Sequence, residues 1–153
     1  MLVVLVILAV YDAKWGELPL VLLLLAVNMG AVILVLKLIS TSLAGDEAIS
    51  ELLNALFGVL ILAGTCFLIY RISHERLMGG GDWILALALA LALADWWLAL
   101  WTIFLANLLG DIIALPGAVK TGKSKVHFGP FLVAAFVIVL VLGNCLPLLL
   151  SAM

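Results

Sequence analysis

Long runs of apolar residues, separated by a few polar positions, occupy almost the whole chain. Hydrophobic residues make up 68% of the 153 positions, and charged residues make up only 10%. Ordinary soluble domains carry about 25% charged residues, so the composition excludes that class. A membrane-spanning helix needs about 20 mainly apolar residues, which leaves room for about five or six helices. We therefore predict an all-α, polytopic membrane protein.

Charged and turn-forming residues divide the apolar sequence into six predicted transmembrane helices. Their approximate bounds are 1–15, 18–39, 49–70, 82–94, 96–115 and 129–150. The first and fourth are short, because about 13 residues cover only about 20 Å of a core that is about 30 Å thick. The alternating stretch ILALALALALA (84–94) has the period of a strand. A lone strand in lipid would leave its backbone groups unpaired, so a helix is expected there too.

The first run, MLVVLVILAVYDAKWG, has neither the basic start nor the cleavage site of a secretory signal. We expect it to remain as the first helix of a single transmembrane domain covering residues 1–153. Cys66 and Cys145 stand alone in apolar runs, with no CxxC pair to bind a metal. They are expected to be core residues. Nothing in the sequence indicates a metal, an organic cofactor or a nucleic-acid partner.

Basic residues predict the orientation of the helices, because connections rich in Lys and Arg remain in the cytoplasm. Six of the seven basic residues lie in or beside the first, third and fifth connections: Lys14, Arg71, Arg76, Lys120, Lys123 and Lys125. Both chain ends are therefore expected outside the cytoplasm. Lys37 is the one exception. Asp95 and the tryptophans Trp96, Trp97 and Trp101 are expected at the outer membrane interface.

Asp12 and Asp82 are expected to lie at the same membrane depth. Asp12 stands where the first helix reaches the cytoplasmic face, and Asp82 stands where the fourth helix leaves it. An Asp within a spanning helix costs up to about 2.5–3.5 kcal/mol, so such residues are candidates for function. The alternative is that Asp82 only caps its helix, which stabilises by about 1 kcal/mol.

Three glycines, Gly79, Gly80 and Gly81, stand directly before Asp82. A cap does not need them, whereas a backbone that approaches a substrate closely, or adopts a positive φ, does. Two carboxylates close together in a partly dry site share a proton and titrate as a coupled pair. Such a pair can activate water and polarise a carbonyl oxygen, as in aspartic proteases.

Three stretches resemble the type IV prepilin peptidases, which are membrane aspartic proteases with a GxGD motif. YDAKWGELP (11–19) is similar to the family's first catalytic segment, in which an Asp is followed by an aliphatic residue and a proline. MGGGD (78–82) fits GxGD, and KVHFGPFLVAAF (125–136) resembles the entry to the last helix. The chain departs from the family pattern at Leu20, at His127, and in lacking a lysine after the GxGD motif.

The resemblance implies an endopeptidase of the inner membrane that removes the short basic leader from type IV prepilins or pilin-like precursors. Asp12 and Asp82 would activate water at the cytoplasmic membrane edge. Substrate-binding roles are implied for Gly79, Gly80, Gly81, Glu75, Pro19, Phe128, Gly129 and Pro130. The paired CxxC motifs of the larger, bifunctional members are missing, so cleavage without N-methylation is expected.

Two alternatives remain open from the sequence. Lipoprotein signal peptidases are also short aspartic enzymes, and VNMGAV (27–32) and ANLLGD (106–111) are faintly similar to their Asn-containing motifs. That reading makes Asp111 catalytic and needs four spans. A non-enzymatic subunit or small transporter would instead use Asp12 and Asp82 to bind a cation or relay protons. Its expected signature, an internal repeat, is not evident.

Overall fold

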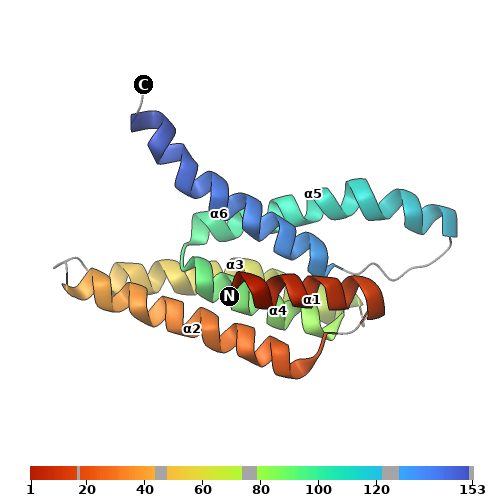
Figure 1. Ribbon diagram of the computed structural model, residues 1–153, viewed down its shortest axis with the longest axis horizontal. Helices are drawn as coiled ribbons and strands as arrows, with labels where there is room; N and C mark the ends of the chain where they lie inside the picture. The colour runs from red at the N-terminus through yellow and green to blue at the C-terminus, as the bar shows by residue number, and fades with distance from the viewer. Residues whose placement is uncertain (17, 44–47, 74–78, 122–127, 152–153) are drawn as a thin grey trace.

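The computed structural model describes residues 1–16, 18–43, 48–73, 79–121 and 128–151. These residues form six α-helices and contain no strand (Figure 1), which confirms the all-α prediction. The helices are α1 (Leu2–Trp15), α2 (Leu20–Leu43), α3 (Ala48–Ser73), α4 (Gly80–Leu93), α5 (Trp96–Thr121) and α6 (Gly129–Ser151). Within the described ranges, three segments are long and apolar enough to cross a membrane: α2, α3 and Trp96–Ile113 of α5. The chain is therefore a polytopic membrane protein.

Several helices extend beyond their predicted bounds. The fifth runs to Thr121 instead of residue 115, and the fourth begins at Gly80, inside the glycine run. The second and third end at Leu43 and Ser73. Hydropathy marks only the part of a helix that lies in lipid, whereas the hydrogen-bonded backbone continues into more polar sequence. At these ends the bounds taken from apolar runs were therefore too short, whereas α2 begins two residues later than predicted.

Helix α4 is the centre of the bundle and contacts α2, α3, α5 and α6. None of its residues is exposed, and leucines and alanines alike are buried: Leu85, Ala86, Ala88, Leu89, Ala90 and Leu93. A helix that is apolar all round is buried by its neighbours. This explains the Leu–Ala alternation, since the leucines fill space and the alanines let adjacent helices come close. It also explains why 14 residues suffice, because a helix enclosed by protein need not match the lipid thickness.

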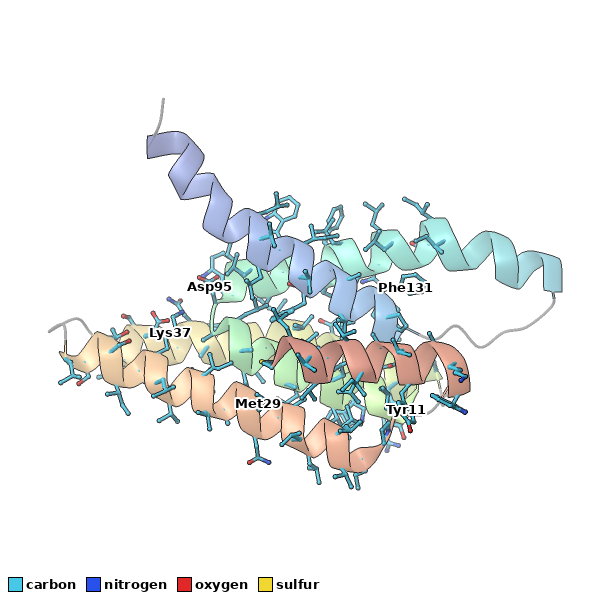
Figure 2. All side chains as sticks on the ribbon, viewed as in Figure 1. Tyr11, Met29, Lys37, Asp95 and Phe131 are labelled. Atoms are coloured by element: carbon cyan, nitrogen blue, oxygen red, sulfur yellow. The ribbon has the colours of Figure 1, made fainter. Side chains whose placement is uncertain are left out.

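The C-terminal end of α4 is fastened by polar contacts. Ala94 ends the helix in the left-handed conformation, with φ 48°. The Lys37 ammonium of α2 donates to the Ala94 carbonyl over 3.2 Å and pairs with Glu51 of α3. Asp95 caps α5, because its carboxylate accepts the N–H groups two and three residues further on. Figure 2 shows Lys37 and Asp95 at this end, and Tyr11 and Phe131 at the other. The lysine that broke the charge pattern therefore has a structural role.

The close approach of α2 and α4 at Gly30 generates a stability prediction. A Cβ at Gly30 would lie 2.6 Å from the Ala88 carbonyl oxygen, whereas one at Gly64 would meet nothing nearer than 4.0 Å. We expect Gly30→Ala to lower the free energy of unfolding by about 1–3 kcal/mol, because the helices must separate. The matched variant Gly64→Ala should be neutral or stabilising by up to about 1 kcal/mol. Unfolding in detergent measures both, and equal effects would contradict the close packing.

Candidate active site

Asp12 lies in the last turn of α1, and its side chain is buried, with 4% exposed. The helix ends at Gly16, whose left-handed conformation (φ 68°) lets its N–H donate to the Asp12 carbonyl over 2.9 Å. The Asp12 carboxylate is held by a different helix: Oδ2 accepts the N–H of Gly129 over 3.1 Å. Gly129 is the first residue of α6. The acid of α1 therefore lies at the positive end of the α6 dipole.

Asp82 lies in the first turn of α4, with 3% of the residue exposed. Its Oδ2 accepts the N–H of Gly79 over 3.1 Å, and its own N–H donates to the Gly79 carbonyl over 3.2 Å. The capping role considered from the sequence is thus confirmed, but it uses only one carboxylate oxygen. The other, Oδ1, is buried and makes no hydrogen bond to any part of the chain that the structure describes. Capping therefore does not account for the whole side chain.

The two acids converge on the backbone of Gly129. A Cβ built at Gly129 would lie 2.6 Å from Asp12 Oδ2 and 3.2 Å from Asp82 Oδ1. The two carboxylates, which are 70 positions apart in the sequence, therefore border one point at the start of α6. A side chain at this position would force the Asp12 carboxylate to move. In Figure 2 this end of the bundle is the one that carries Tyr11 and Phe131.

The three glycines before Asp82 let the chain's own side chains approach α4. A Cβ at Gly81 would lie 2.8 Å from Leu18, and a Cβ at Gly80 would lie 3.6 Å from the ring of Tyr70. The expectation of a positive φ was wrong, because among the described residues only Gly16 and Ala94 adopt one. The other reason considered, close approach to a substrate, stays a prediction, since the close neighbour at Gly81 is Leu18 of the same chain.

Three residues expected to bind substrate also help to start helices. The carbonyl of Pro19 accepts the N–H groups of Leu22 and Leu23 in α2, and that of Phe128 accepts two N–H groups of α6. Pro130 stands at the beginning of α6, where its missing N–H costs nothing. The remaining expected residue, Glu75, lies outside the described residues, as does His127.

Tyr70 was missed by the sequence reasoning. It lies near the end of α3, and its ring packs on Gly80, two residues from Asp82. The available signal was its position, since a tyrosine at the end of an apolar run reaches the same depth as the GxGD segment. Its proximity to Gly80 could not have been inferred, because it depends on how α3 packs against α4.

The residues of the lipoprotein signal peptidase alternative do not come together. The amides of Asn28 on α2 and Asn107 on α5 donate to carbonyls of their own helices, over 2.8 Å in each case. Asp111 is exposed on α5, which does not contact α2 among the described residues. The described residues also contain no group of three or more His, Cys, Asp and Glu side chains that could hold a metal ion.

Two adjacent buried carboxylates at the N-termini of two helices can act together as a proton acceptor and a proton donor. Such a pair can share one proton, so that one member accepts a proton while the other donates one. The helix dipoles stabilise the ionised member, by about 0.3–1 kcal/mol for each favourable helix end. The arrangement is thus suited to general acid–base work on a water molecule and a carbonyl group.

Comparison with known families agrees with this chemistry. The family model described as the type IV leader peptidase family matches residues 1–115. The match includes Asp12, the glycine run and Asp82, and it ends before Gly129. No curated protein sequence and no solved structure gives a significant match. Because the matched segment covers well over half of the chain, this peptidase belongs to the type IV leader peptidase family.

Proposed function

We propose that this protein is an aspartic endopeptidase that removes the short basic leader from type IV prepilins or pilin-like precursors. Asp12 and Asp82 form the catalytic pair, and residues 1–153 act as one transmembrane peptidase domain. The observation that supports this most directly is the convergence of the two buried carboxylates on Gly129. Helix capping alone does not require the two carboxylates to lie next to each other.

The proposed reaction needs only the carboxylate pair, water and the peptide. The ionised carboxylate takes a proton from water as the water oxygen bonds to the scissile carbonyl carbon. The protonated carboxyl gives its proton to the carbonyl oxygen, which produces a neutral tetrahedral intermediate. This intermediate then collapses: the C–N bond breaks, a hydroxyl proton returns to the pair, and the leaving nitrogen takes a proton from it. The pair ends with one proton, as it began.

The proposed substrate matches the depth of the site. A pilin-like precursor has a basic leader followed by an apolar helical segment, and the cut falls at the junction between them. Asp12 lies in the last turn of α1 and Asp82 in the first turn of α4, so both lie at helix ends rather than in mid-membrane. The basic residues Lys14 and Arg71, close to these ends in sequence, support a cut at the cytoplasmic face of the inner membrane.

Replacing either acid tests the catalytic assignment. Asp12→Asn and Asp82→Asn keep the shape of the side chain but remove the proton acceptor. Each should lower kcat for cleavage of a prepilin-like peptide by about three orders of magnitude or more. The assay is peptide cleavage in detergent, with thermal unfolding as the check on folding. Full cleavage by both variants would rule the proposal out.

Asp111→Asn is the matched control, because it removes an exposed acid from α5. It should cleave like the unaltered protein. Loss of cleavage in Asp111→Asn alone would favour the lipoprotein signal peptidase alternative. If no variant of the three, nor the unaltered protein, cleaved any pilin-like peptide, a cation-binding or proton-relaying subunit would become the better explanation.

Gly129→Ala tests whether the pair must be positioned this closely. The new Cβ would lie 2.6 Å from Asp12 Oδ2, so the carboxylate must move. We expect kcat to fall by about 100-fold, the effect of a misplacement of about 1 Å. The control is Gly110→Ala, whose Cβ would make an ordinary 3.6 Å contact with Phe128. If Gly129→Ala cleaved as fast as Gly110→Ala, the two carboxylates would not need to be held this close together, and the prediction would be wrong.

The orientation of the site can be measured with single cysteines. In a chain without its native cysteines, Lys14→Cys should react with a membrane-impermeant maleimide only when the cytoplasmic face is accessible. Trp96→Cys, at the other end of the bundle, should react only from the opposite face, because α4 separates the two ends. Labelling of position 14 from the outer face would place the site on the wrong side for a cytoplasmic leader.

A further inference from the structure

Helices α4 and α6 both begin at the aspartate pair, and their first N–H groups can be accounted for one by one. The first N–H groups of any α-helix have no carbonyl partner within the helix and need partners from elsewhere. In α6 they are all used. Gly129 donates to Asp12, Pro130 has no N–H, and Phe131 and Leu132 both donate to the carbonyl of Phe128.

Helix α4 is different, because two of its donors remain. The N–H of Gly79 donates to the Asp82 carboxylate, and the N–H of Asp82 donates to the carbonyl of Gly79. The N–H groups of Gly80 and Gly81 make no hydrogen bond to the part of the chain that the structure describes. A Cβ built at Gly81 would lie 2.8 Å from Leu18, whereas a Cβ built at Gly80 would lie 3.6 Å from the Tyr70 ring. Gly80 is therefore the less crowded of the two.

A second observation indicates that a ligand completes this helix end. Asp82 Oδ1 belongs to the same first turn, is buried and has no hydrogen-bond partner among the described residues. The nearby N–H of Gly129 donates to Asp12 over 3.1 Å. A buried polar atom without a partner costs about 1–3 kcal/mol, and such atoms are rare in proteins. Among the described residues, the first turn of α4 thus has an unpaired acceptor, Asp82 Oδ1, and unpaired N–H donors. The acceptor suits a water molecule, and a donor suits the carbonyl oxygen of a peptide beside it.

We propose that the backbone N–H of Gly80 donates a hydrogen bond to the carbonyl oxygen of the scissile peptide bond. This inference rests on the proposed function, and it assigns a substrate contact to that same site. A carbonyl oxygen has two lone pairs. One takes the proton of the carboxyl pair, and the other accepts the Gly80 N–H at the positive end of α4. The donor stabilises the charge that develops on this oxygen as water attacks, so it acts mainly in the transition state.

Gly80→Pro removes this N–H while keeping the helix. Proline is favoured at the first position of a helix. The preceding residue, Gly79, already has the extended conformation that a following proline requires, with φ −72° and ψ 153°. The matched control is Gly80→Ala, which adds a Cβ in ordinary contact with Tyr70 and keeps the N–H. The two variants differ mainly in the donor.

The expected result is a much lower kcat in the proline variant than in the alanine variant. Relative to Gly80→Ala, Gly80→Pro should lower kcat by about 100-fold with KM nearly unchanged, as for loss of one oxyanion-hole donor. If Gly80→Pro also lowers the thermal unfolding midpoint, glycolic acid at position 80 replaces the N–H with an ester oxygen and adds no bulk. That ester variant should show the same loss of kcat.

Two results would overturn the inference. One is a proline or ester variant that cleaves as fast as Gly80→Ala. The other is a rise in KM with kcat unchanged, which would make Gly80 a contact to the bound substrate without a role in the transition state. Neither result would affect the aspartate assignment, because that is decided by Asp12→Asn and Asp82→Asn.

Discussion

The side chains of Asp12 and Asp82 lie next to the first turns of α4 and α6, and the packing of the helices has to accommodate this close contact. Asp12 comes from α1 and is held by the first N–H of α6, while Asp82 closes the first turn of α4. The Asp12 contact joins residues that are far apart in the sequence, whereas the Asp82 contact lies within the first turn of α4. The distance between the carboxylates is therefore determined by how three helices pack. Small residues make that packing possible, since a Cβ at Gly129 or Gly81 would collide with Asp12 or Leu18.

Asp82 combines a structural role with the chemical role proposed for it. Asp82 uses one oxygen to cap α4 and leaves the other without a partner among the described residues. The structural use fixes the rotamer, which keeps the second oxygen directed towards the start of α6. A side chain that is held in this way needs no reorganisation when the reaction begins, and preorganisation of this kind is the largest contribution to many enzymatic rate enhancements.

The sequence was sufficient to predict the six helices and the proximity of the two acids. Apolar runs gave all six helices, and the alternation of basic connections put Asp12 and Asp82 at one end of the bundle. It could not predict what the glycines contact, because Leu18 and Tyr70 reach them through tertiary packing. Nor could it reveal that Lys37 binds the carbonyl at the end of α4, since a charge count treats every lysine as a signal of topology. Helix ends were also misplaced, as hydropathy reports the lipid boundary rather than the hydrogen bonds.

Because α4 is held in place at Ala94, the length of this helix determines the position of Asp82. Its far end is fixed by Lys37 and by the tight connection through Asp95, and its near end carries Asp82, 14 helical residues in all. Adding or deleting a single residue between these points would shift the acid by about 1.5 Å and turn it by roughly 100° around the helix axis. The repetitive Leu–Ala stretch is thus constrained in length as well as in packing. Although its sequence is repetitive, the number of residues between Asp82 and Ala94 is fixed by the position that the acid must occupy.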